Sequence, residues 1–151
     1  MISKHKKALV FSSIVILLPI PVWALLRSRM PEPLNMSWFF WGGPLIMLAF
    51  HWLCVLFTTL DPGNRGRNKK MIDLVLWIIP LINTLSYFGL YALNLGLEFS
   101  PVACTMVPIG ILMAVIGNYM PKTRMNSTMG IKVPWAYSSE ENWNATHRFA
   151  G

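Results

Sequence analysis

Four long apolar runs constrain this chain of 151 residues more than any other feature, and they cover 8–26, 38–60, 72–97 and 102–120. As a helix, the first run would rise about 28 Å, close to the hydrocarbon thickness of a bilayer. The runs are continuous rather than alternating, and an open sheet edge cannot be accommodated in lipid. The sequence therefore predicts an all-α, polytopic membrane protein built as a four-helix transmembrane bundle.

Composition and charge support this interpretation. Only 13% of the residues are charged, whereas a soluble domain carries about 25%, so the lipid bilayer is the expected solvent. The positive-inside rule places both termini in the cytoplasm, and the net charge of +7 then requires no direct nucleic-acid partner. Arg27 and Arg29 fall on the other side, opposite eleven basic residues: Lys4, Lys6, Lys7, Arg65, Arg67, Lys69, Lys70, Lys122, Arg124, Lys132 and Arg148.

The first run has an alternative interpretation as a cleaved signal peptide. It follows three lysines and ends in "PVWA", where Val22 and Ala24 are the small residues that a cleavage site needs. Its nearly full spanning length favours a retained span instead.

The third run carries a polar stripe on one side. Asn83, Tyr87, Tyr91 and Asn94 lie within about 80° of each other at 100° per residue. Small residues, Gly89, Ala92 and Gly96, lie roughly opposite, which predicts a helix packed between neighbours. Interhelical hydrogen bonding is the favoured role of the stripe, and a ligand groove or pathway is the alternative. Gly110, Ala114 and Gly117 form a second small-residue face in the fourth run.

Chemistry-bearing residues are sparse. His51 and Cys54 are three residues apart and could form half of a metal site, but no second pair has ligand spacing, so a packed histidine is expected. No nucleophilic triad, phosphate loop or intramembrane carboxylate pair is present. We therefore predict no metal, no cofactor and no enzymatic activity. An enzyme with His147 as its base is the weaker alternative.

The C-terminal segment, 121–151, differs in character from the bundle of 1–120. It is predicted to be a cytoplasmic loop followed by a short amphipathic helix. Ser138 and Glu141 offer a capping box at the start of that helix, and Gly151 would end it. Trp143, Thr146, His147 and Ala150 share one face, so the helix is expected to lie at the headgroup interface. Asp61, Pro62, Gly63 and Asn64 read as a turn that stops the second span.

The segment "GNYMPKTRMNSTMGIKVPWAYSSEENWNATHRFAG" resembles the signature of the SdpI-type immunity proteins of bacteria. The region 44–70 is similar to the less specific second span and inner loop of that family. The positions that match the signature are Gly117, Asn118, Met120, Pro121, Lys122, Asn126, Gly130, Ile131, Pro134, Trp135, Ser139, Trp143, Thr146, His147, Arg148 and Gly151. Twelve of them we regard as candidate partner-binding residues: Asn118, Pro121, Lys122, Asn126, Gly130, Pro134, Trp135, Trp143, Thr146, His147, Arg148 and Gly151.

This resemblance implies a protein of the bacterial plasma membrane that protects the cell against a secreted peptide toxin. It also implies signalling, in which a cytoplasmic transcriptional repressor is sequestered at the membrane. A small transporter or channel subunit is the alternative function. Two departures from the family pattern are visible: the outer loop at 30–33 is short, and full members continue with two further spans. Either the chain is a truncated version of the family pattern, or the partner elements come from another copy in a homo-oligomer.

Overall fold

The computed structural model describes residues 2–30, 37–64, 69–98 and 100–151, and these ranges contain helices and loops but no strand. The helices are α1 (Ile2–Leu17), α2 (Pro19–Leu26), α3 (Ser37–Leu60), α4 (Lys69–Asn94), α5 (Pro101–Tyr119) and α6 (Glu140–Ala150). Short 3-10 turns are η1 (Arg27–Arg29), η2 (Pro62–Asn64) and η3 (Met120–Lys122). Arg65 and Arg67, which entered the charge argument, lie outside the described residues, and so do residues 31–33 of the short outer loop.

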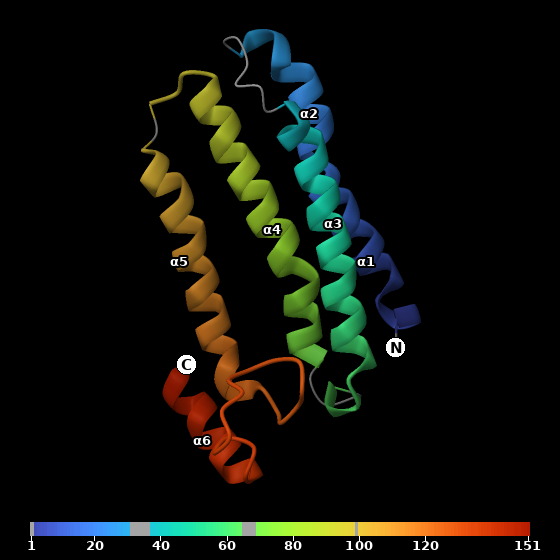
Figure 1. The fold of residues 1–151 in the computed structure, drawn as a ribbon, viewed down its shortest axis with the longest axis vertical. Helices are drawn as coiled ribbons and strands as arrows, with labels where there is room; N and C mark the ends of the chain where they lie inside the picture. The colour runs from blue at the N-terminus through green and yellow to red at the C-terminus, as the bar shows by residue number, and fades with distance from the viewer. Residues whose placement is uncertain (1, 31–36, 65–68, 99) are drawn as a thin grey trace.

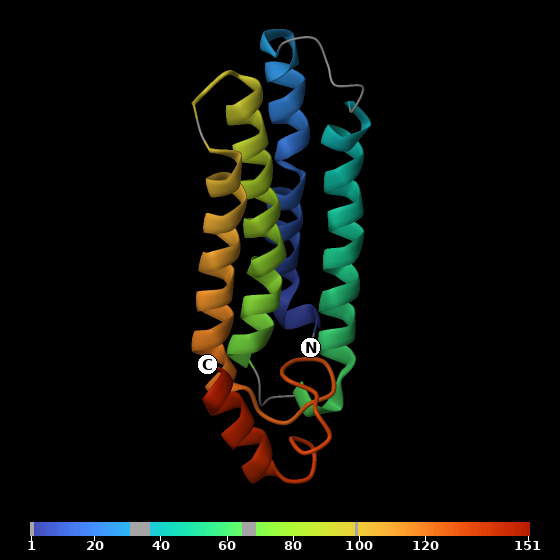
Figure 2. The same cartoon turned by 60° about the vertical axis from the view of Figure 1, so that its left-hand side comes forward.

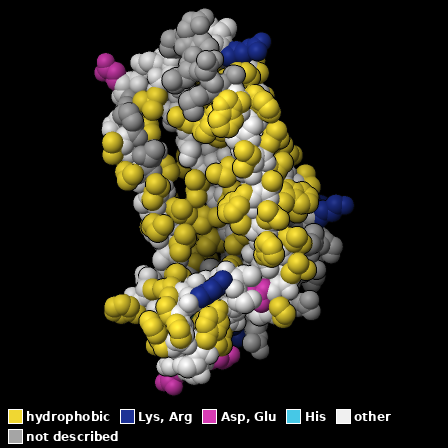
Figure 3. All heavy atoms as spheres, viewed as in Figure 1, with side chains coloured by type: hydrophobic (Ala, Val, Ile, Leu, Met, Phe, Trp, Pro, Cys, Tyr) yellow, Lys and Arg dark blue, Asp and Glu magenta, His cyan; other side chains and the backbone are white. Residues whose placement is uncertain are grey.

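The all-helical, four-span architecture is confirmed. Among the described residues, four segments are long and apolar enough to cross a membrane: Lys6–Arg29, Trp38–Leu60, Ile72–Asn94 and Val102–Lys122. They stand side by side as a bundle, and α6 lies beyond its lower end (Figures 1 and 2). Large apolar side chains are exposed along these helices, and Figure 3 shows them covering the flank of the bundle, as expected for a surface solvated by lipid.

Helix α4 is the centre of the bundle, as its opposed polar and small faces predict. It packs against α1, α3 and α5, and Figure 2 shows it between α5 and α1. Of its small residues, Ala92 is buried and Gly89 lies against Cys104 of α5. Gly96 follows the end of α4 with a φ of +76° and packs against nothing nearby, so it ends the helix rather than lining a helix contact.

The polar stripe of α4 forms hydrogen bonds to neighbouring helices. Asn83 Nδ2 donates to the Ile16 carbonyl at 3.0 Å, and the Tyr91 hydroxyl donates to the Pro19 carbonyl at 2.7 Å. The Tyr87 hydroxyl reaches the Phe39 carbonyl in α3 at 2.8 Å. Three stripe residues therefore connect helices. Asn94 does not, because its amide donates to Leu90 of its own helix.

A further side chain of α4 contacts the first span where that span is interrupted by a proline. Pro19 begins α2 directly after the interruption at Leu18, and it has no N–H to donate to the Val15 carbonyl four residues earlier. That carbonyl accepts the Leu18 N–H at 3.3 Å and also the Thr84 hydroxyl of α4 at 3.3 Å. The neighbouring helix thus adds a donor where the helical hydrogen-bond pattern is broken.

His51 is a packed histidine within the bundle. It is fully buried, and its Nε2 lies 3.0 Å from the Ser12 hydroxyl, which itself donates to the Leu9 carbonyl. Cys54 is half-buried with a free thiol. Among the described residues, no group of three potential metal ligands is found.

The α4–α5 contact supports a paired test. A Cβ at Gly89 would lie 3.2 Å from Cys104 Cβ, whereas nothing lies within 4 Å of the Cβ position at Gly110, on the second small-residue face. Gly89→Leu should therefore overpack the helix contact and destabilise the bundle by about 1–3 kcal/mol. Gly110→Leu should leave thermal unfolding in detergent nearly unchanged. Equal melting shifts for the two variants would contradict this packing of α4 on α5.

Candidate functional site

The candidate site is the folded segment 121–151, called the tail below, where it packs against the lower end of the bundle. Helix α6 runs back toward α5, so that the C-terminal residue Gly151 lies beside Gly117 in the last turn of α5. Both views show α6 folded under α5 and connected to it by a long loop (Figures 1 and 2). The tail is therefore a packed unit at the membrane boundary.

The N-terminus of α6 is capped one residue later than predicted. The side chain of Ser139, not Ser138, accepts a hydrogen bond from the Asn142 N–H at 3.0 Å. Ser138 lies outside the helix, donates to the Trp135 carbonyl, and accepts from the Asn142 side chain. Either serine can act as an N-cap, but only Ser138 has a Glu three residues later, so the capping-box pattern pointed to Ser138 whereas the turn after Trp135 places Ser139 at the cap.

Two buried side chains of α6, Trp143 and His147, form the core of the tail. Both are 0% exposed, and their rings stack with centroids 4.1 Å apart. Trp143 Nε1 donates to the Thr123 carbonyl at 2.8 Å, and the Tyr137 ring packs against the same indole. The loop 123–137 thus closes over this face of α6.

Both ring nitrogens of His147 have hydrogen-bond partners within the tail. The Ile131 N–H donates to Nε2 at 2.9 Å, so Nε2 is the acceptor. Nδ1 lies 2.8 Å from the Trp143 carbonyl and is therefore the N–H donor. With both nitrogens used within the tail, neither is left to act as a catalytic base.

Close approach explains two glycines of the signature. Gly130 has a φ of +105°, and a Cβ there would overlap His147 Nε2. A Cβ at Gly151 would overlap the Gly117 carbonyl and crowd the Pro121 ring. Any larger residue at these positions would push α6 away from the loop or from α5.

A buried carboxylate, Asp61, connects the tail to the end of α3. Its Oδ1 accepts from the Gly63 N–H at 2.8 Å. Its Oδ2 accepts from the Ser127 N–H at 2.9 Å, the Ser127 hydroxyl at 3.0 Å and the Thr128 hydroxyl at 2.9 Å. Asp61 is only 7% exposed, so these donors replace the water that the charge would otherwise need.

The ionisation of Asp61 follows from this environment. Burial alone would raise the pKa of the carboxyl group, but the hydrogen bonds from Gly63, Thr128 and Ser127 together hold that pKa below its usual value. The carboxylate is therefore charged at neutral pH, and its charge contributes to holding the tail in place.

Asn126 shapes the loop that Asp61 binds. Its side-chain oxygen accepts from the N–H groups of Thr128 and Met129, and its amide donates to the Arg124 carbonyl. The Tyr137 hydroxyl donates to the Asn126 carbonyl at 2.9 Å. Asn126 is thus a structural member of the signature, because it organises the turn that presents Ser127 and Thr128.

The structure corrects the expected orientation of α6. The face that carries Trp143 and His147 was expected to lie at the headgroup interface, but the protein's own loop covers it. Phe149, on another side of α6, is 96% exposed, and Trp135 in the loop is 64% exposed. Among the other signature residues, Thr146 is half-buried, and the exposed ones include Asn118, Pro121, Lys122, Pro134 and Arg148.

The partners of the tail cannot be identified from the sequence pattern. The residues around Asp61 predict only a turn, and no pattern marks Thr123, Ser127 or Thr128. The one available signal was an acidic residue placed beside a strongly basic loop at the end of a span. Its donors are about 66 residues away in sequence, and no periodicity relates them.

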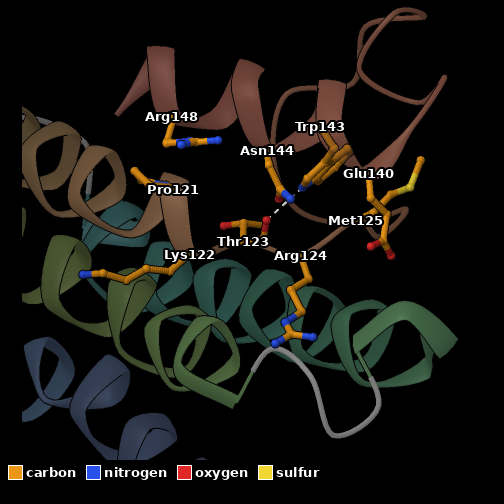
Figure 4. Close-up of a pocket in the computed structure, with 9 residues that line it drawn as sticks. All are labelled: Pro121, Lys122, Thr123, Arg124, Met125, Glu140, Trp143, Asn144 and Arg148. Atoms are coloured by element: carbon orange, nitrogen blue, oxygen red, sulfur yellow. Dashed lines mark hydrogen bonds between the residues drawn. The ribbon is translucent and has the colours of Figure 1, made fainter.

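A hollow opens between α6 and the segment that follows α5 (Figure 4). Its volume is about 400 Å³. Arg148 and Asn144 belong to α6, and Lys122 and Arg124 belong to the facing segment. The residues that line it are Pro121, Lys122, Thr123, Arg124, Met125, Glu140, Trp143, Asn144 and Arg148.

The tail matches a known protein family. The model of the SdpI/YfhL protein family matches residues 122–151. The resemblance to SdpI-type immunity proteins is confirmed. The immunity protein SdpI of Bacillus subtilis (strain 168) is 23% identical over 107 residues, which cover 71% of this chain and 50% of that relative. The chain thus spans about half the length of this SdpI relative. No solved structure matches it.

Proposed function

We propose that this protein is a membrane immunity protein of the SdpI type, which protects the cell that makes it against a secreted toxic peptide. The observation that carries the proposal is the match of the family model to 122–151, the segment that folds as one unit around Trp143 and His147. The four apolar helices support a role in the membrane. There the protein could bind a toxic peptide that attacks the bilayer.

In this proposal the protein acts by binding, without enzymatic chemistry. His147 is the candidate base of the alternative enzymatic function, and both of its ring nitrogens are hydrogen-bonded within the tail. The exposed residues of the tail, among them Trp135 and Arg148, would then be the surface available to a cytoplasmic repressor. Trp and Arg are frequent anchors of protein interfaces.

A transporter or channel subunit has less support. The observation that favoured it was the polar stripe of α4, and three residues of that stripe form hydrogen bonds to the backbone of neighbouring helices. A side chain that satisfies a buried carbonyl is not free to line a pathway.

A survival assay tests the immunity function. The full chain is expressed in a sensitive bacterium, which is then exposed to a panel of secreted toxic peptides. Cells that carry the empty vector are the control. Expression should raise survival against at least one peptide. The Trp143→Ala variant should lose that protection, and membrane abundance is measured by immunoblot in the same cultures. Unchanged killing by every peptide, at normal abundance of the protein, would refute the proposal.

The proposed orientation, with both termini and the tail in the cytoplasm, predicts a labelling pattern. Lys132 is exposed in the tail, and Ser28 is exposed at the opposite end of the bundle. In intact cells, a membrane-impermeant thiol reagent should label a Ser28→Cys variant and spare a Lys132→Cys variant, in a background without Cys54 and Cys104. After permeabilisation both should react. If the reagent labels Lys132→Cys and spares Ser28→Cys in intact cells, the topology is the inverse of the one proposed.

A further inference from the structure

The hollow between α6 and the end of α5 combines shape with positive charge. Its lining includes three cationic side chains, Lys122, Arg124 and Arg148, and a single carboxylate, Glu140. Lys122 Nζ lies 5.0 Å from the centre of the Tyr119 ring in the last turn of α5. Figure 4 shows the guanidinium of Arg148 on α6, across from the segment that carries Lys122. A ligand in this space would meet cations from two different elements.

The position of the hollow relative to the bilayer narrows the class of ligand. The fourth candidate span extends to Lys122, so the residues that end the span also line the cavity. Helix α6 returns its C-terminal end to Gly117 of α5, which brings Phe149, 96% exposed, to the same boundary. The cavity therefore lies at the level of the lipid headgroups, where an exposed aromatic ring is also favourable.

Space for acyl chains adjoins this position. Helix α5, which ends beside the cavity, leaves apolar side chains exposed along its length, including Met106, Ile109 and Met113. A phospholipid whose headgroup entered the cavity could lay its chains against this helix. A soluble phosphate compound would gain nothing from that surface.

We propose that this cavity binds the phosphate of an anionic phospholipid, with Arg148 as its main ligand and Lys122 as a supporting cation. Basic pockets beside transmembrane helices are suited to anionic headgroups, and the guanidinium group of Arg148 can hold a phosphate with two parallel hydrogen bonds. The proposal does not depend on the immunity function, because it rests only on the cavity and on its place at the membrane boundary.

The test measures lipid binding to the purified full chain in an uncharged detergent by native mass spectrometry. The probes are dioctanoyl phosphatidylglycerol, dioctanoyl phosphatidylcholine and glycerol 3-phosphate. Phosphatidylcholine carries the same phosphodiester with an added quaternary ammonium, so it should bind more weakly in a basic cavity. Glycerol 3-phosphate carries the phosphate without acyl chains and should also bind more weakly than phosphatidylglycerol.

The variants are chosen to separate this cavity from general basicity. Arg148→Gln should weaken the binding of phosphatidylglycerol by about tenfold or more, as expected for loss of a charge-assisted pair. Lys132→Gln removes an exposed tail cation outside the cavity and should change the affinity less than about twofold. Lys122→Gln gives a second measurement from the opposite wall if Arg148→Gln lowers the melting temperature of the protein.

Each contrary result overturns the proposal. Equal affinity for phosphatidylcholine would show that the charge of the lipid is not recognised. Equal affinity for glycerol 3-phosphate would assign the cavity to a soluble phosphate compound. Equal effects of the cavity variants and Lys132→Gln would show that binding does not take place here.

Discussion

Replacing Trp143 with alanine should destabilise the packing of the tail by about 3–5 kcal/mol, the range for removal of a large buried aromatic side chain. Trp143 is 0% exposed, and its loss removes the stacking partner of His147 and the hydrogen bond to the Thr123 carbonyl. The space left by the indole is too large for the short loop around it to fill. Because the tail has few other buried side chains, we expect α6 to detach while the four spans remain folded.

Trp135 provides the matched control, since it lies in the same tail but is 64% exposed. Trp135→Ala should change the stability of the tail by no more than about 0.5 kcal/mol, as for surface substitutions in general. Amide hydrogen exchange reports the two regions separately: protection should vanish in 140–150 and persist in α4. Unchanged exchange in α6 of the Trp143→Ala variant would mean that the indole does not hold the tail.

The second large effect is expected at Asp61. Asp61→Asn keeps the shape of the side chain but removes the charge and replaces one acceptor oxygen with an NH2 group. Both oxygens of Asp61 accept hydrogen bonds, so in either orientation the NH2 group faces a donor. The loss should be about 1.5–3 kcal/mol, the range for a hydrogen bond to a charged group. Removal of this anchor should free the loop 123–129 from the end of α3.

The pH dependence of the anchor follows from the sign of its pKa shift. The pKa of Asp61 is lowered in the folded state, so the unfolded chain binds the proton more readily. The stabilisation is therefore complete above the unfolded pKa of about 3.9 and is lost as the pH falls through the lower folded value. The wild-type tail should loosen in that acidic range, and the Asp61→Asn variant should show a smaller dependence there.

The exposed carboxylate Glu141 provides the control for this experiment. Glu141→Gln changes the same charge near the start of α6 but should leave the pH profile of loop exchange close to that of the wild type. If Glu141→Gln and Asp61→Asn reduce the acid dependence equally, the effect belongs to the net charge of the tail and not to the Asp61 anchor.

These expectations assign a structural role to several of the signature residues. Trp143, His147, Gly130 and Asn126 hold the tail in one conformation, and a pattern of sequence letters cannot distinguish this role from partner recognition. Only the exposed members, such as Trp135 and Arg148, are available to another molecule. A substitution of Trp143 that abolished protection would therefore report on folding first.

The sequence by itself determined the class of fold, because lipid leaves few alternatives. A run of about 20 apolar residues must satisfy its backbone hydrogen bonds internally, so the four spans can be predicted from local composition alone. The central place of α4 could also be predicted, since its polar stripe and the Gly89 side require neighbours on both faces. Local signals even marked the turn after Asp61 and the beginning of α6 to within one residue.

Only the tertiary structure decided which contacts the residues of the tail make. The contact of Asp61 with Ser127 and Thr128, and the closure of the loop 123–137 over Trp143, join groups that are far apart in the chain. Nothing in a local pattern specifies such pairs, because a helix face looks equally amphipathic whether lipid or the protein's own loop covers it. The same reason explains why the basic residues of 122–148 read as a simple charge bias in the sequence. Folding of α6 back onto the end of α5 places three of them around one cavity.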